Sequence, residues 1–329
     1  MQLSRGYLLP VLFLVLVALA TLFPPVCAGS SPALSPADNP SAAQMQVAIY
    51  VNSIDNLDMV TGTYTVDYYL HFRWTDPRIT DPHFEIMNGE PASGTGSVAL
   101  LSEDTNGPVK DLWYRVRADF RIVPNNLDYP FESGTLPIIL EDTRYNNSEM
   151  VYVPLTRDSG MDPGFGIPGW KLGTPTFTVT AQTYPWNDTY SRLSFNIPIT
   201  NDAAASLVQT IVPPLLFCII AALSFFIDVK HNELVHLRYV LVTSMFISAV
   251  MYHFSQIALV PGLGVLKIFD KFMIAVYLFL AVTIMVTTLC YLAQQQWNRP
   301  GLVRPLNRYG VVASIVLPVI LFLLLVKLV

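Results

Sequence analysis

The sequence predicts an extracellular all-β, immunoglobulin-like sandwich followed by an all-α, four-helix transmembrane domain. Three features lead to this fold class: the composition, the uneven charge, and a change from alternating to continuous hydrophobicity. Hydrophobic residues make up 52% of the 329 residues and charged residues only 13%, whereas a typical soluble domain has roughly 25% charged residues. Residues 29–205 hold 21 acidic and 10 basic residues, a balance of −11, and residues 206–329 hold three acidic and eight basic ones. The first stretch is therefore expected to face water and the second to lie in a bilayer, and the lack of a basic stripe argues against nucleic acid as a partner.

The N-terminus has the three parts of a secretory signal peptide, predicted over residues 1–28. Arg5 precedes an apolar run over Tyr7–Leu22, and the small residue Ala28 closes the segment. An uncleaved anchor helix is the alternative, which the small-residue exit disfavours. Residues 29–44 are rich in Pro, Ser and Ala and are expected to form a flexible lead-in. Export predicts a multi-pass protein of the plasma (inner) membrane, with its ectodomain in the periplasm or outside the cell.

Residues 45–202 are predicted to form the β domain. Apolar and polar residues alternate over 64–74 and again over 112–122, which is typical of strands with one buried and one wet face. Shorter runs follow over 177–181 and 193–199, with turn clusters such as Asp162-Pro163-Gly164 between them. Many short strands separated by turns favour a β-sandwich.

No motif in the β domain points to catalysis. The three cysteines, Cys27, Cys218 and Cys290, all lie outside it, which excludes a disulfide framework and a cysteine-based zinc site there. His71 and His83 belong to no recognisable nucleophile or metal motif. The sequence therefore predicts no enzyme, no cofactor and no metal site, and a membrane-anchored enzyme is the weakest of the interpretations.

Residues 203–329 are predicted to cross the membrane four times. Four stretches without Asp, Glu, Lys or Arg approach or exceed the roughly 20 residues that a spanning helix needs. These stretches are Ser206–Ile227, Tyr239–Leu266, Phe272–Asn298 and Tyr309–Val326. The second must end early, because Pro261 interrupts it. Three arginines and no acid follow the third run, which places that linker in the cytoplasm.

The second apolar run is more polar than a lipid-facing helix. At about 100° per residue, Ser244, Ser248 and Ser255 share one sector, while His253 and Gln256 point roughly the opposite way. One helix cannot enclose a pore, but several copies around an axis can. Hydrogen bonding inside one closed bundle is an equally good interpretation of the stripe alone.

Four short stretches carry a resemblance to a known family. They are Phe72–Arg78, Leu127–Leu136, Thr210–Phe217 and Ala258–Pro261. In this order, after an exported β domain, they resemble the pentameric ligand-gated ion channels, the Cys-loop receptor superfamily, and within it the prokaryotic branch. The resemblance implies a homopentamer in which five copies of the second helix surround a conduction path for permeant ions.

Counting back from Pro261, the resemblance implies a set of pore-lining residues. They are Val240, Ser244, Ile247, Met251, Phe254 and Ala258. A ring of Ile247 side chains would be the hydrophobic gate, because a narrow apolar ring expels water. The alternative for these apolar side chains is ordinary helix packing. Glu233 and His236 would form the inner-mouth selectivity region, and the acidic ectodomain favours monovalent cations.

The resemblance also implies a ligand site between neighbouring ectodomains. Its residues would be Phe165, Tyr184, Trp186 and Tyr190, forming an aromatic cage of the kind that holds amines by cation–π attraction. The agonist would be a small molecule or the proton. Packing within the hairpin is the alternative for these rings.

Coupling between the domains is expected at loops on the membrane face. The coupling residues are Asp55, Asp58, Tyr129, Pro130, Phe131, Glu132, Pro261 and Lys267. The sequence departs from the family at Asp202, where an Arg is usual. The alternative for the loop charges is that they are simply solvated, since surface pairs contribute only about 0–1 kcal/mol. The competing function is a non-conducting membrane sensor or solute-binding protein on the same scaffold.

Overall fold

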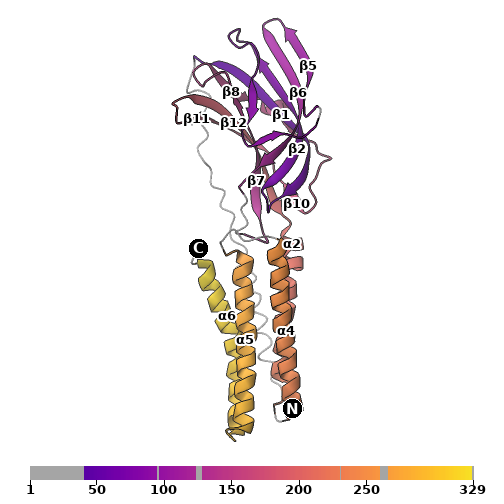
Figure 1. The fold of residues 1–329 in the computed structure, drawn as a ribbon, viewed down its shortest axis with the longest axis vertical. Helices are drawn as coiled ribbons and strands as arrows, with labels where there is room; N and C mark the ends of the chain where they lie inside the picture. The colour runs from indigo at the N-terminus through magenta and orange to yellow at the C-terminus, as the bar shows by residue number, and fades with distance from the viewer. Residues whose placement is uncertain (1–40, 95, 124–127, 230, 260–265, 328–329) are drawn as a thin grey trace. The chain divides into compact units, whose positions relative to one another are not determined.

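The computed structural model describes residues 41–94, 96–123, 128–229, 231–259 and 266–327. The expected signal peptide, most of the lead-in and Pro261 lie outside the described residues. The chain divides into two compact units, one of strands and one of helices (Figure 1). Among the described residues, the β unit contains those of 41–123 and 131–202, and the helical unit contains those of 203–327 together with the short segment 128–130.

The first sheet of the β unit has seven strands among the described residues. Five follow one another in the order β4 (Gly89–Pro91), β6 (Val109–Arg121), β2 (Thr63–Trp74), β1 (Ala43–Asp58) and β8 (Met150–Pro154). In addition, β5 (Val98–Asn106) pairs with β6, and β9 (Gly160–Met161) pairs with β1. β1 is antiparallel to β2 but parallel to β8 and β9. It begins at Ala43, two residues inside the expected lead-in.

The second sheet has five strands in the part of the chain that the structure describes. Their path is β10 (Trp170–Leu172), β12 (Thr189–Asn201), β7 (Ser133–Asp142) and β3 (Phe84–Ile86), and β11 (Thr176–Thr183) pairs with β12. The two sheets form a β-sandwich, which confirms the two-sheet architecture predicted for this part of the sequence. The four strands predicted from alternation correspond to β2, β6, β11 and β12.

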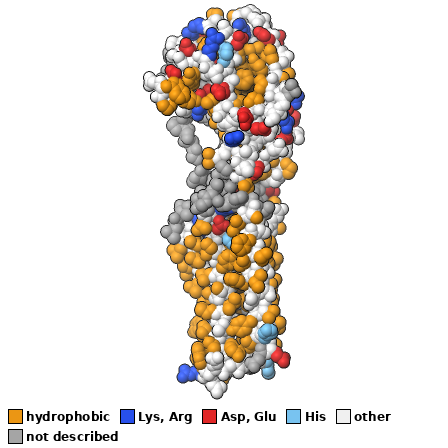
Figure 2. Space-filling view, viewed as in Figure 1, with side chains coloured by type: hydrophobic (Ala, Val, Ile, Leu, Met, Phe, Trp, Pro, Cys, Tyr) orange, Lys and Arg blue, Asp and Glu red, His pale blue; other side chains and the backbone are white. Residues whose placement is uncertain are grey.

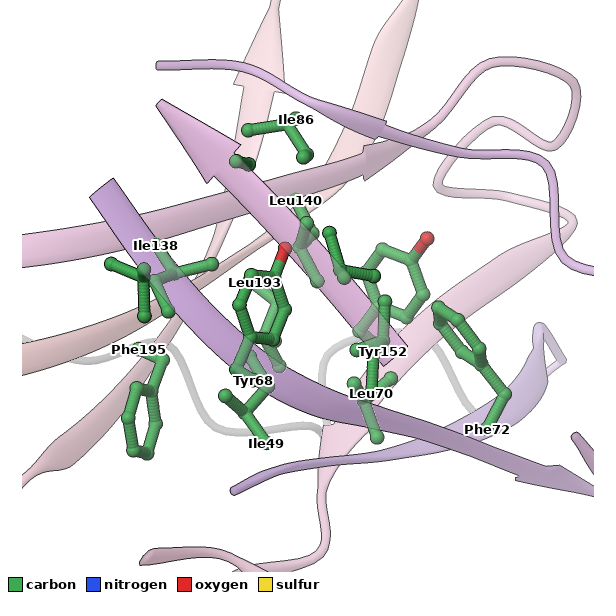
Figure 3. Packing of buried hydrophobic residues seen from close by; sticks show 14 of the residues in the cluster. Ile49, Tyr68, Leu70, Phe72, Ile86, Ile138, Leu140, Tyr152, Leu193 and Phe195 are labelled. Atoms are coloured by element: carbon green, nitrogen blue, oxygen red, sulfur yellow. The ribbon is translucent and has the colours of Figure 1, made fainter. Parts of the chain in front are cut away.

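The core lies between the two sheets (Figure 3). Tyr68, Leu70 and Phe72 on β2 are fully buried and face side chains of β7 and β12, including Ile138 and Phe195. These are the residues on one face of the predicted alternation, because successive side chains of a strand point to opposite sides.

The other face of β2 was expected to be wet, and this prediction is wrong. Thr65, Asp67 and His71 on that face are all buried. Long side chains of β6 cover them: Arg115 pairs with Asp67 at 2.9 Å, and the Trp113 ring stacks on His71 with centroids 4.1 Å apart. Side chains of the neighbouring strand β6 therefore cover the polar face of β2, so this face is not exposed to water.

The helical unit contains four long helical segments among the described residues, each long and apolar enough to cross a membrane. The segments are Ala203–Phe226, Glu233–Ala258, Ile268–Gln295 and Pro300–Lys327. Apolar side chains dominate the visible surface of this unit in Figure 2. The four spans confirm a multi-pass membrane protein.

The first span changes helix type along its length. It consists of α2 (Ala203–Ser206), the π-helix η3 (Leu207–Ile211), α3 (Val212–Leu223) and the 3₁₀ turn η4 (Ser224–Phe226). The second and third spans correspond to α4 (Asn232–Leu259) and α5 (Ile268–Gln295), and the fourth joins η5 (Pro300–Leu302) to α6 (Val303–Lys327). α5 contacts α3, α4 and α6, so it is the helix around which the others pack.

Candidate functional site

The face of α4 that the sequence marks as pore-lining is exposed in the chain. Its large apolar members are Val240, Ile247, Met251 and Phe254, with exposed fractions of 47%, 58%, 65% and 65%. Ser244 and Ala258 on the same face are also exposed. The six residues lie at intervals of three or four, so they form one stripe along the helix. We call these six residues the α4 stripe.

Exposed side chains of the neighbouring helices differ in chemistry from those of α4. On α3 the exposed positions are Leu216, Ile219 and Leu223. Those between residues 312 and 326 of α6 are likewise all Val, Leu or Ile. By contrast, α4 exposes the hydroxyl side chains Thr243, Ser244 and Ser255. The aliphatic faces of α3 and α6 are suited to contact with lipid, whereas hydroxyl groups at membrane depth usually face water or a protein interior.

The opposite side of α4 makes specific polar contacts with its neighbours. His253 lies with Nε2 3.1 Å from the Asp270 carboxylate and with Nδ1 2.8 Å from the Tyr277 hydroxyl. Because a carboxylate only accepts, Nε2 carries a hydrogen, and in the neutral imidazole Nδ1 then accepts from Tyr277. Gln256, which also points away from the α4 stripe, accepts a 2.6 Å hydrogen bond from Tyr129. The polar residues of this helix therefore separate into a set that bonds to neighbouring segments and a set exposed on the helix surface, of which Ser255 donates to the carbonyl of Tyr252 within α4 at 2.7 Å.

A third polar contact fixes α4 to the first span. The Tyr252 hydroxyl lies 2.8 Å from the carbonyl oxygen of Gln209 and 3.1 Å from that of Thr210. In an α-helix these carbonyls would accept from the N–H groups of residues 213 and 214, but both are prolines and have none. The Tyr252 hydroxyl therefore supplies one hydrogen-bond donor to two carbonyl groups whose usual backbone donors are absent.

The segment around Tyr129 groups with the helices rather than with the strands beside it in sequence. The carbonyl of Tyr129 accepts from the N–H of Phe269 at 3.3 Å, and the two rings meet edge to face at 5.8 Å. The Lys267 ammonium lies 5.8 Å from the centroid of the Tyr129 ring. Phe269 is buried and also contacts the rings of Tyr252 and His253. This hub joins the Tyr129 segment to the end of the helix that carries the α4 stripe.

At the other end of α4, charged residues divide between the surface and the interior. Glu233 and His236 are exposed in the first turns of the helix, where a carboxylate is favoured by the helix dipole. Arg238 is only 1% exposed, and its guanidinium lies 5.1 Å from the centre of the Phe225 ring. The two expected inner-mouth residues therefore lie on the surface of the helix, and the nearby arginine does not.

Three of the four expected ligand-binding residues come together in the turn between β11 and β12. The rings of Tyr184 and Trp186 are stacked with centroids 4.7 Å apart, and Tyr190 meets Tyr184 edge-on at 6.0 Å. We call these three residues the aromatic cluster. Trp186 is the most exposed of them, with an exposed fraction of 64%.

A buried acid positions the aromatic cluster. Glu141 on β7 accepts a 2.8 Å hydrogen bond from the Tyr184 hydroxyl and forms an ion pair with Arg192. Burial and the Glu141 carboxylate both raise the pKa of Tyr184, so its hydroxyl stays a donor at neutral pH. Sequence reasoning missed Glu141, because it lies 43 residues before its partner. Phe269 was also missed, because it lies far from Tyr129 in the sequence.

The fourth expected residue, Phe165, lines a different feature. It packs against the sandwich core and borders a cleft together with Ile54, Arg117 and Trp170. None of the aromatic cluster lines that cleft.

The expected coupling residues of the β unit have partners within that unit. Asp55 pairs with Arg117 at 3.0 Å, and Asp58 accepts from the backbone N–H groups of the turn that follows it. The side chain of Thr61 and these backbone N–H groups lower the pKa of Asp58 by hydrogen bonding to its carboxylate. Glu132 is buried and accepts a 3.0 Å hydrogen bond from Asn201, next to Phe131 in the chain.

Asp202, the residue that departs from the family pattern, lies 3.4 Å from the Lys171 ammonium. Its backbone N–H donates to the carbonyl of Gly169. No protein-family model matches the chain, and no curated protein matches it in sequence.

Proposed function

We propose that this chain is one subunit of a homopentameric, ligand-gated ion channel, in which five copies of α4 line the conduction path and the β unit is the extracellular ligand-binding domain. The observation that carries this proposal is the chemistry of the α4 stripe and its flanks. α4 exposes hydroxyl groups at membrane depth, whereas α3 and residues 312–326 of α6 expose only aliphatic side chains. Exposed hydroxyl groups find water when helices of several subunits surround a pore. In lipid they can bond only to carbonyls of their own helix, as Ser255 does to Tyr252.

The gate in this proposal is a ring of Ile247 side chains. Ile247 lies in the middle of the α4 stripe and is 58% exposed in the single chain. Five such side chains around an axis would form a narrow apolar ring that ions do not cross until it widens. Met251 and Phe254 lie one and two turns further along and would extend the constriction.

Ligand binding is assigned to the aromatic cluster. An exposed Trp186 stacked on Tyr184 offers the aromatic faces that attract an organic cation. The Glu141–Arg192 ion pair behind Tyr184 holds that ring in place without leaving an uncompensated charge. A small organic amine is therefore the preferred agonist class.

Monovalent cations are the preferred permeant ions. Residues 29–205 have a balance of −11, and five copies would concentrate cations near the path. Glu233 is exposed near the start of α4 and would add a ring of carboxylates. The hub at Tyr129 and Phe269 would transmit movement to α4, since Tyr129 contacts both Gln256 on α4 and Phe269 on α5.

The proposal is tested with purified protein in proteoliposomes loaded with a cation-sensitive dye. Cysteine is placed either in the α4 stripe, as Ser244→Cys, or on α3, as Ile219→Cys, both in a Cys218→Ser background. A charged, membrane-impermeant thiol reagent should modify Ser244→Cys and reduce cation flux. Ile219→Cys is the matched control, because Ile219 is 57% exposed but belongs to the aliphatic face of α3.

Two results would contradict the channel. One is equal reactivity of the two cysteines, which would put both faces in the same environment. The other is an absence of flux with every amine tested and at every pH, with amines still bound at the aromatic cluster. That second result would favour the non-conducting sensor.

A further inference from the structure

The cleft that Phe165 borders is separate from the aromatic cluster. It has a volume of about 720 Å³ and lies between the end of β1, Arg117 on β6, and the connection from β9 to β10. Small-molecule sites typically have volumes of roughly 300–1,000 Å³. The cleft is therefore large enough for a ligand of amino-acid size or somewhat larger.

The path of β1 creates this cleft. The pairing of β1 with β2 shifts register between Val51 and Ser53 and again between Asp55 and Asp58. Between the last two, Asn56 has a φ of 52°, in the left-handed region. Bulges of this kind bend a strand away from its sheet and often lie next to binding sites. The bend leaves space that the connection from β9 to β10 only borders.

The walls of the cleft combine apolar and charged groups. Phe165 and Trp170 are half-buried, pack against the core and line the cleft. Asp55 and Arg117 form an ion pair at 3.0 Å, with 42% and 46% of their side chains exposed. A half-exposed ion pair is weakly held, so each partner is available to an incoming group of opposite charge.

We propose that this cleft binds an amphipathic zwitterion, an α-amino acid with an apolar side chain. The ligand ammonium would pair with Asp55 and its carboxylate with Arg117, whose guanidinium suits a carboxylate through paired N–H donors. The apolar side chain would lie against Phe165 and Trp170. This site is distinct from the one assigned to the agonist and does not require the protein to be a channel.

Three probes that share a phenyl ring test the contribution of each charged group of the ligand separately. Purified full-length protein in detergent is titrated by calorimetry with L-phenylalanine, with phenethylamine, which lacks the carboxylate, and with 3-phenylpropionate, which lacks the ammonium. The titrations are made with wild type and with Trp186→Leu, and affinities for the cleft are compared in Trp186→Leu, where amine binding at the aromatic cluster is removed. L-Phenylalanine should bind at least about tenfold more tightly than either analogue, since each analogue loses a hydrogen bond to a charged group. Equal affinities, or no binding of all three, would overturn the proposal.

Variants then assign each contact. Arg117→Gln should remove the preference for L-phenylalanine over phenethylamine, and Asp55→Asn should remove its preference over 3-phenylpropionate. Trp170→Leu should weaken all three probes. Glu90→Gln is the control, because it removes an exposed carboxylate paired with Arg121 outside this cleft. Binding that survives Trp170→Leu but is lost in Trp186→Leu would place the ligand at the aromatic cluster and refute this inference.

Discussion

The hydroxyl of Tyr252 on α4 donates to the backbone carbonyl of Gln209, 2.8 Å away, in the π-helical turn of the first span. In a π-helix this carbonyl would accept from residue 214 and in an α-helix from residue 213, and both are prolines. Neither helical pattern can therefore satisfy it. The contact links the helix that carries the α4 stripe to the only π-helical turn among the described residues.

Replacing Tyr252 with Phe should consequently destabilise the protein by about 1–3 kcal/mol, the usual effect of leaving a polar group without a partner away from water, because a carbonyl within a membrane span has no water to bond to. The measurement is the thermal unfolding temperature in detergent. Tyr239→Phe is the control: the Tyr239 hydroxyl bonds to Thr288 at 2.9 Å, and Thr288 still has the carbonyl of Ile284 as partner. Equal losses in the two variants would show that the prolines are not the reason for the Tyr252 contact.

Replacing Ile247 with Ser should give a leak at rest. A shift of only about 1.4 kcal/mol between closed and open states multiplies the open population about tenfold, and five hydroxyl groups in place of an apolar ring favour water there. Resting cation flux into proteoliposomes measures this. Ile219→Ser makes the same change at an equally exposed site on α3 and should leave the flux unchanged. A leak of the same size in both would remove Ile247 from the gate.

Acid should weaken the β unit through Asp67. Burial opposes ionisation of this carboxyl, but the hydrogen bonds from Arg115 and Asn52 outweigh it and lower its pKa. A lowered pKa contributes stability that is present above the ordinary carboxyl value of about 3.9 and is lost as pH falls through the folded value. Asp67→Asn should therefore lower the unfolding temperature by a few degrees at pH 7 and by less at pH 3.

The control for that comparison is Glu90→Gln, which alters an exposed pair at 3.6 Å and should have little effect at either pH. If the difference in unfolding temperature between wild type and Asp67→Asn grew on acidification, the lowered pKa of Asp67 would not be the source of the stability.

Gly310 should not tolerate a larger residue. A Cβ at this position would lie 2.3 Å from one methyl carbon of Val286 on α5 and 2.7 Å from the other. Gly310→Ala should therefore separate α5 from α6 and cost about 1–3 kcal/mol, measured as a loss of thermal stability. Gly301→Ala, with nothing within 4 Å of its Cβ, should be neutral, and adding Val286→Ala to Gly310→Ala should restore stability. Failure of that rescue would locate the damage elsewhere.

The parts of the structure that could be predicted are those that depend on neighbours in sequence. The α4 stripe follows from helical geometry alone, because residue number sets the angle around the helix. The buried side chains of β2 follow from alternation in the same way. The need for a donor near Gln209 could be predicted from two adjacent prolines.

What could not be predicted depends on residues distant in sequence. Asp67 and His71 are buried only because Arg115 and Trp113, more than 40 residues later, lie across them. Phe165 and Tyr184 belong to different connections, and nothing in their spacing shows that one borders a cleft and the other stacks on Trp186. The contacts of Glu141 could likewise not be predicted, because its partner Arg192 on β12 comes near it only when β12 pairs with β7.

Residues 128–130 belong to the helical unit, and this determines how the protein can be divided into fragments. A fragment that ends at Asp202 would carry Tyr129 without Gln256 and Phe269, the two residues that bond to its hydroxyl and its carbonyl. A chimaera that joins these strands to foreign helices would have the same mismatch. Domain-exchange experiments should therefore move this short segment together with the membrane spans, although in sequence it lies between β6 and β7.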